Sequence, residues 1–94
     1  MTAIIIKQDE EPEEKIELLS GAFCIGRAMD NDLTIADATV SSHHARIFTY
    51  LGASYIEDLD SSNGTWLNGK RVQKHTLHPG DVIKVGKHIL EIAQ

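Results

Sequence analysis

The sequence predicts an all-β protein, either a sandwich or a barrel of many short strands. Apolar residues recur at every second position in short runs such as Ile4/Ile6 and Phe23/Ile25, and this period of two is typical of half-buried strands. Turn signals that contain glycine, proline or asparagine separate these runs at short intervals along the chain. A chain of 94 residues forms one small domain, with enough surface to bury a single core.

The first half of the chain contains expected strands around residues 4–6, 16–18, 23–25 and 33–35, with turns at Ser20-Gly21 and Asp30-Asn31-Asp32. Residues 12–19 also fit a short helix, because Pro12 suits a first helical turn and Ile16 and Leu19 are spaced three apart. A helix this short is marginal, and Ile16 and Leu18 fit a strand equally well. We therefore expect a strand here.

The second half continues the same pattern, with turns at residues 51–54, Asn63-Gly64 and Asn68-Gly69 around an alternating run at residues 55–59. Pro79-Gly80 suits the centre of a type II turn, because proline presets φ and glycine accepts a positive φ. Residues 81–92, interrupted at Gly86-Lys87, are expected to form a closing hairpin.

Composition and charge narrow the classes of function. The net charge is −5, and residues 9–17 account for all of it with six acidic residues and one lysine. We interpret this run as a solvated loop, and the remaining, neutral body lacks the basic stripe that nucleic-acid binding requires. No apolar run approaches the ~20 residues that span a bilayer, and no secretion signal is recognisable at Met1. The single cysteine, Cys24, suits a reducing compartment, so a cytoplasmic protein without a membrane partner is expected.

Four clusters of small polar residues interrupt the expected strands, at Gly26-Arg27 and at residues 40–45, 58–65 and 68–71. Hydrogen-bond donors dominate them: a guanidinium, serine hydroxyls, asparagine amides and two histidines. Such clusters suit an anionic ligand better than metal binding or hydrolysis.

The motifs resemble those of the forkhead-associated (FHA) domain, and they are Gly26-Arg27, Asp32-Leu33-Thr34-Ile35, Ser41-x-x-His44-Ala45, Ser61-Ser62-Asn63-Gly64-Thr65-x-x-Asn68-Gly69 and Leu77-x-Pro79-Gly80-Asp81. Five blocks in this order make the resemblance specific, and it extends from about residue 4 to residue 92. It implies one domain over residues 1–94, a two-sheet β-sandwich of about eleven short, mostly antiparallel strands. It also implies a non-catalytic phosphothreonine-peptide recognition module in kinase-linked signalling that binds through loops at one end and needs no cofactor. The implied partners are phosphothreonine-containing substrates of Ser/Thr kinases, in trans or within a larger parent chain.

The resemblance assigns two sets of residues to the site. Expected phosphopeptide ligands are Arg27, Ser41, Ser42, Ser62 and Asn63, and expected structural supports are Gly26, His44, Gly64, Thr65 and Asn68. The chemistry agrees: a guanidinium holds phosphate oxygens with two hydrogen bonds, and an asparagine amide can read an extended peptide backbone. Other interpretations stay open, among them an ion pair of Arg27 with Asp30 or Asp32, and hairpin turns at Asn-Gly.

The chain departs from the family pattern at two positions. Ser42 stands where many members have arginine, and Asp60 stands where glycine is common. Phosphate binding should therefore depend more on Arg27, with Lys70, Arg71 or His43 as outer contributors.

The same residues also bear on rival classes of function. Ser41, His44 and Asp58 have the side chains of a hydrolase triad, but no strained nucleophile elbow accompanies them. His43 and His44 are neighbours expected to face opposite ways, so they cannot chelate one metal ion together. The main alternative is a phospho-independent interaction or dimerisation domain that uses a sheet face. Separately, Tyr55 and Trp66 are expected in the core or on a sheet face. The loops at residues 29–32 and 69–74 are expected to set preferences for residues that flank the phosphothreonine.

Overall fold

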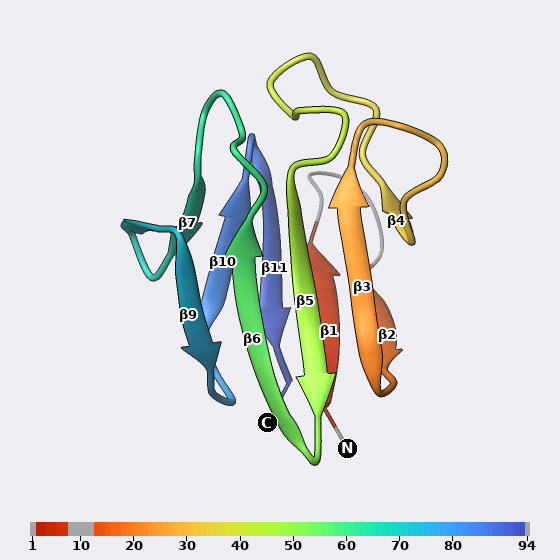
Figure 1. The fold of residues 1–94 in the computed structure, drawn as a ribbon, viewed down its shortest axis with the longest axis vertical. Coiled ribbons are helices and arrows are strands. Elements are labelled where there is room, and N and C mark those ends of the chain that lie inside the picture. Colours follow the sequence, from red (N-terminus) through yellow and green to blue (C-terminus); the bar gives the residue numbers. More distant parts are fainter. Residues whose placement is uncertain (1, 8–12, 94) are drawn as a thin grey trace.

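The computed structural model describes residues 2–7 and 13–93, and these residues form eleven strands in two sheets (Figure 1). One sheet has six strands in the order β2 (Glu14–Leu18), β1 (Thr2–Lys7), β11 (His88–Ile92), β10 (Val82–Val85), β7 (Thr65–Leu67) and β8 (Lys70–Val72). The other has five, in the order β4 (Leu33–Thr34), β3 (Gly21–Gly26), β5 (Ala45–Tyr50), β6 (Ala53–Asp58) and β9 (Lys74–Leu77). Hydrogen-bonded neighbours are antiparallel except for β3 and β4. The expected all-β sandwich is confirmed.

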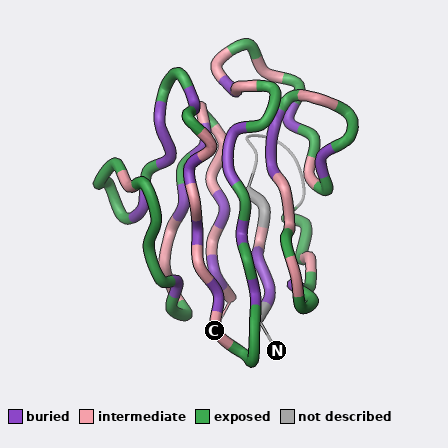
Figure 2. Tube along the Cα trace, in the orientation of Figure 1, coloured by how far each residue is buried: buried purple, intermediate pink, exposed green. Residues whose placement is uncertain are grey.

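The core lies between the two sheets and follows the period of two in the strands (Figure 2). On the five-stranded sheet Ile47 and Ile56 are fully buried, and on the six-stranded sheet Ile83 and Leu90 are fully buried. Side chains from both inner faces therefore form one cluster, as in other aligned sandwiches. The described residues form no helix, and so none that is long and apolar enough to cross a membrane.

The strand expected near residue 16 is confirmed as β2, at the edge of the six-stranded sheet. Glu14 and Glu17 lie exposed on this strand, so the second half of the acidic run is not the loop that the sequence suggested. Charges on an edge strand deter pairing with other chains. Pro12 and the first acids of the run, residues 9–11, lie outside the described residues.

The two Asn-Gly pairs differ in structure. Asn68 and Gly69 join β7 to β8 with φ of 49° and 84°, which is the positive-φ pair of a tight hairpin. Gly64 also has a positive φ, 87°, but it leads into β7 from the loop after β6, a strand of the other sheet. The hairpin interpretation of Asn63-Gly64 is therefore wrong, whereas the closing hairpin of β10 and β11 is confirmed.

Three connections gather at one end of the sandwich, the top of Figure 1: the loops after β3, between β4 and β5, and between β6 and β7. Backbone hydrogen bonds join them, from Arg27 N to Ser41 O at 2.9 Å, from Ala28 N to Ser42 O at 3.1 Å and from Leu59 N to His44 O at 2.9 Å. This end therefore carries the polar clusters found in the sequence.

Candidate functional site

The three loops border an open cavity of about 280 Å³, lined by Arg27, Ala38, Thr39, Val40, Ser41, Ser42, Ser62 and Asn63. All five residues expected to bind the phosphopeptide line this one cavity, although they come from three separate segments. The lining carries hydroxyl, amide and guanidinium groups and no carboxylate. Its chemistry suits an anion.

Arg27 directly follows β3, and it lines the cavity. Its Nε donates a hydrogen bond to the Val40 carbonyl at 3.1 Å, which fixes the plane of the guanidinium. Within the described part of the chain neither carboxylate proposed as its partner engages it: Asp30 binds His43, and Asp32 accepts from the Cys24 N–H at 2.7 Å. The terminal N–H groups of Arg27 therefore remain for a ligand.

Ser41 and Ser62 join the second loop to the third. The Ser62 backbone N–H donates to Ser41 Oγ at 3.1 Å, so the Ser41 hydroxyl hydrogen is left to donate elsewhere. The side chains of both serines line the cavity, as does the exposed Ser42 at its rim.

Asn63, from the third loop, is held by Thr39 of the second loop across the cavity. Its Nδ2 donates to the Thr39 carbonyl at 2.9 Å, which leaves Oδ1 as an acceptor. Thr39 is held by Asp37, whose Oδ1 accepts from the Thr39 hydroxyl at 2.6 Å and from the Thr39 N–H at 2.8 Å. The pKa of Asp37 is lowered to about 2, mainly by the hydrogen bond from the Thr39 hydroxyl and then by the bond from the Thr39 N–H and by His88. The segment from Asp37 to Val40 thus supplies the carbonyls that orient both Asn63 and Arg27.

His44 lies fully buried beneath the loops. Its Nδ1 accepts from the Ser41 N–H at 3.1 Å, so Nε2 carries the proton and donates to the Gly64 carbonyl at 2.8 Å. His44 therefore connects two loops through their backbones. It does not bind the Ser41 hydroxyl, as a hydrolase triad would require.

Asp58 organises the third loop from the end of β6. It accepts hydrogen bonds from the Ser61 hydroxyl, from the Ser61 N–H at 3.1 Å and from the fully buried Thr65 hydroxyl at 2.7 Å. Burial acts to raise the pKa of Asp58, but these bonds outweigh it and the pKa lies below its usual value. Ser61 Oγ in turn accepts from the Gly64 N–H at 3.0 Å. The carboxylate of Asp58 thus binds groups of the third loop. It makes no hydrogen bond to His44, which a hydrolase triad would require.

Two glycines permit close approach of neighbouring groups, a loop backbone at Gly26 and the side chain of Arg71 at Gly64. A Cβ on Gly26 would lie 2.3 Å from the Ser42 carbonyl oxygen, well inside van der Waals contact. A Cβ on Gly64 would lie 2.6 Å from Arg71 Nε. Arg71 therefore passes beside the third loop, although it does not line the cavity.

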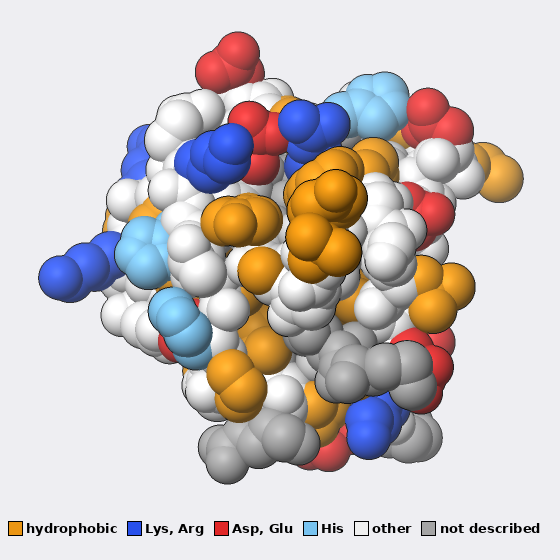
Figure 3. All heavy atoms as spheres, turned by 60° about the horizontal axis from the view of Figure 1, so that its bottom comes forward, with side chains coloured by type: hydrophobic (Ala, Val, Ile, Leu, Met, Phe, Trp, Pro, Cys, Tyr) orange, Lys and Arg blue, Asp and Glu red, His pale blue; other side chains and the backbone are white. Residues whose placement is uncertain are grey.

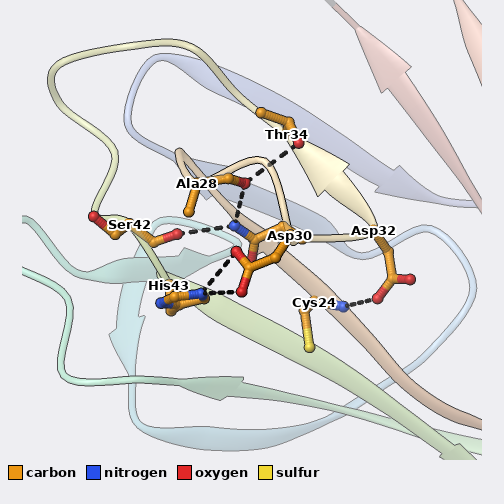
Figure 4. Close-up of polar contacts among 8 residues, drawn as sticks. Cys24, Ala28, Asp30, Asp32, Thr34, Ser42 and His43 are labelled. Atoms are coloured by element: carbon orange, nitrogen blue, oxygen red, sulfur yellow. Dashed lines mark hydrogen bonds and ion pairs between the residues drawn. The ribbon is translucent and has the colours of Figure 1, made fainter.

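Asn31 is a site residue that the sequence presented only as part of a turn. It is buried, and its Nδ2 donates to the Ala28 carbonyl at 2.7 Å and to the Ser42 carbonyl at 2.9 Å. Figure 4 shows the same region, where His43 reaches Asp30 at 3.0 Å and thereby lowers the pKa of Asp30. Asn31 lies between two exposed acids in the sequence, so its role could be recognised only from its distant partner, Ser42.

Asn68 lies apart from these loops, at the far end of β7. Its Nδ2 donates to Asp81 Oδ1 at 3.0 Å, and its Oδ1 accepts from the Val82 N–H at 2.9 Å. Its side chain therefore holds the β7–β8 turn against β10. Asp60, by contrast, lies in the third loop, exposed and with φ of 55°, the left-handed region that explains why glycine suits this position.

Comparisons with known proteins find the chain similar to FHA domains. A family model for the FHA domain matches residues 23–86. An ABC transporter ATP-binding/permease protein of Mycobacterium tuberculosis, Rv1747, is 47% identical over 70 residues, which are 74% of this chain and 8% of that protein. A structure from a structural and functional analysis of phosphothreonine-dependent FHA domain interactions is 29% identical with a TM-score of 0.87, and the match covers 98% of this chain and 96% of that one. Mycobacterium tuberculosis EmbR in complex with a low-affinity phosphopeptide is 31% identical with a TM-score of 0.83, over 97% of this chain and 24% of EmbR.

Proposed function

Because the chain belongs to the FHA-domain family, whose members recognise phosphothreonine peptides without catalysing a reaction, we propose that the loop cavity binds the phosphothreonine. The Arg27 guanidinium and the hydroxyls of Ser41, Ser42 and Ser62 would hold the phosphate, and Asn63 would hold the peptide backbone. The observation that carries this assignment is the convergence of these five residues on one cavity without a carboxylate.

Electrostatics support a phosphate ligand at this place. A phosphothreonine carries a charge of about −1.5 to −2 at neutral pH, so an acid in the cavity would repel it. The nearby carboxylates of Asp30, Asp37 and Asp58 are each engaged by other side chains. Arg27, oriented by Val40, is then the cation that faces the ligand, and charge-assisted bonds from a guanidinium are roughly twice as strong as neutral ones.

The peptide is proposed to lie extended across the second and third loops. Asn63 Nδ2 binds the Thr39 carbonyl, which leaves Oδ1, and this oxygen would accept a peptide N–H. The supporting roles proposed for Gly26, His44, Gly64 and Thr65 follow from their contacts beneath the loops. Asn68 is a support of the fold at the other end of β7, not of the cavity.

The chain spans 8% of the length of the transporter protein and 24% of EmbR. The binding partner of this chain is therefore proposed separately from what those whole proteins do. We propose a phosphothreonine segment made by a Ser/Thr kinase, either on another protein or in a larger parent chain. A cytoplasmic setting is proposed with it, because such kinases act there and Cys24 is a free thiol.

An oriented phosphothreonine peptide library tests the proposal, followed by calorimetry on the selected peptide and on its phosphoserine and unphosphorylated forms. The threonine methyl is proposed to sit between Ser41 and Asn63. One buried methyl is worth about 0.8 kcal/mol, or about four-fold in affinity, so the phosphothreonine form should bind at least that much tighter than the phosphoserine form. Equal affinities would remove the methyl pocket, and binding of the unphosphorylated form would contradict the phosphate site itself.

A further inference from the structure

The outer face of the five-stranded sheet has an unusual composition for a solvent-facing surface. Three of the chain's five aromatic residues, Phe48, Tyr50 and Tyr55, point outward from β5 and β6. Phe48 is 41% exposed and Tyr50 is 61% exposed, and the adjoining Leu51 is 85% exposed. Figure 3 shows a cluster of hydrophobic side chains on the surface, with basic and acidic side chains beside it. An apolar patch of this kind commonly marks an interaction surface.

The patch includes a groove of about 410 Å³ lined by Arg46, Phe48, Tyr50, Tyr55, Glu57 and Lys74. It is separate from the phosphate cavity, with which it shares no lining residue. Arg46 Nε donates to Glu57 Oε1 at 2.6 Å across the two central strands, while Lys74 lies on the edge strand β9. The face therefore combines one ion pair, one further cation and a band of aromatic side chains.

The order of these residues makes the face complementary to itself. The register of β5 and β6 pairs Arg46 with Glu57, Phe48 with Tyr55, and Tyr50 with Ala53. A two-fold axis that runs parallel to the strands, between β5 and β6 and in the plane of the interface, would exchange the two members of each pair. It would place Arg46 against the second copy's Glu57. In the same way it would place the bulky Tyr50 against the second copy's small Ala53.

We propose that this face binds a second copy of the chain, as an isologous dimer with its two-fold axis parallel to β5 and β6. The other in-plane axis, perpendicular to the strands, would oppose Arg46 to Tyr50 and bring the charged row onto the aromatic row. Overall charge does not oppose the dimer, because the −5 of the chain originates in residues 9–17 and the rest is neutral. Face-to-face sheets cross at about −30°, which a two-fold axis inclined by half that angle to the strands produces, so the residues nearest the axis keep this register best.

The size of the face predicts a weak dimer. Strands of six residues at about 3.4 Å each, and four strands about 4.8 Å apart, give a face of roughly 20 by 20 Å. Two copies would bury on the order of 800 Å² together, below the ~1,200 Å² of a standard interface. We therefore expect a weak monomer–dimer equilibrium that is visible only at high protein concentration, in which both phosphate cavities lie at the same end of the dimer.

Sedimentation equilibrium with a charge swap tests the proposal. Arg46→Glu makes the face acidic and Glu57→Arg makes it basic, so neither variant should self-associate. A 1:1 mixture of the two should form a dimer of twice the 10.4 kDa chain mass, because the acidic face then meets the basic one. Lys84→Glu, an equal charge reversal on the other sheet, is the matched control and should dimerise as the wild type does.

Thermal unfolding of each variant verifies its fold, since an exposed ion pair contributes only about 0–1 kcal/mol. The proposal is overturned if the wild type stays monomeric up to about 1 mM, the concentration at which even an association of only about −4 kcal/mol would be half complete. It is equally overturned if either single variant dimerises like the wild type, or if the mixture stays monomeric. A different protein that binds this face while the chain remains monomeric would also refute the second copy as its occupant.

Discussion

Replacement of Arg27 is the sharpest test of the loop cavity. Its Nε is held by the Val40 carbonyl at 3.1 Å, so the two terminal nitrogens are presented in a fixed plane. Two hydrogen bonds to a phosphate follow, each worth about 1.5–3 kcal/mol when fully formed with a charged group. The site is open to solvent, which weakens such pairs, and we take about 2–3 kcal/mol for both together.

Arg27→Ala should therefore weaken binding of a phosphothreonine peptide by about 30- to 150-fold. Arg27→Lys should be almost as damaging, because an ammonium on a flexible stem cannot bind Val40 and two phosphate oxygens at once. The measurement is calorimetry with one library-selected phosphothreonine peptide at fixed salt, with Lys84→Ala, on the opposite sheet, as the control that also removes one positive charge. If Arg27→Ala stays within about three-fold of wild type, less than 1 kcal/mol, the phosphate is held elsewhere.

Two further predictions concern the supports beneath the cavity. His44→Ala should lower the free energy of unfolding by about 2–4 kcal/mol, because it leaves the Ser41 N–H and the Gly64 carbonyl without partners; an unchanged melting temperature with lost binding would instead make His44 a ligand. The pKa of Asp58 is lowered in the folded state, so its stabilising contribution is present above its unfolded pKa of about 3.9 and is lost as the pH falls through the lower folded value. Urea unfolding of wild type and Asp58→Asn from about pH 2 to pH 7 measures this difference, and an equal loss of stability at every pH would contradict it.

The fold could be predicted because local and family signals agreed. Strand alternation, turn residues at Pro79-Gly80 and Asn68-Gly69, and the order of the motifs all indicated the same sandwich. The cavity could be predicted for a different reason: the resemblance placed Arg27, Ser41 and Asn63 on one site although they are far apart in sequence. No periodicity would have brought these loops together.

What the sequence did not disclose depends on contacts between distant residues. Asn31 has turn-forming character in the sequence, yet it holds a wall of the cavity through the Ser42 carbonyl. Asp37 binds its near neighbour Thr39, but this contact matters for the cavity because the Thr39 carbonyl accepts from the distant Asn63. The reverse error concerns Asn63-Gly64, where a strong local hairpin signal lies between two strands that do not pair. Local signals describe short turns well, but they do not distinguish a hairpin from a crossing between sheets.

Local signals also left open which side chains of β5 face the core. In β5, Ile47 and Thr49 alternate with Phe48 and Tyr50, and both sets contain apolar residues, so a period of two does not decide which set faces the core. The fold buries Ile47 completely and leaves Phe48 and Tyr50 outside, because the opposite choice would bring Arg46, one pleat along, into the core.

The core is complete without Phe48 and Tyr50, and the cross-strand pair of Phe48 with Tyr55 stabilises a single copy by only about 0.2–1 kcal/mol. A second copy would bury these side chains as well, and it has a consequence for binding. An axis parallel to the strands places two phosphate cavities side by side, and a partner with two phosphothreonines would bind the second cavity at an effective concentration of up to millimolar order. A doubly phosphorylated peptide should then gain affinity over a singly phosphorylated one in the wild type and lose that gain in Arg46→Glu, whose phosphate cavity is unchanged.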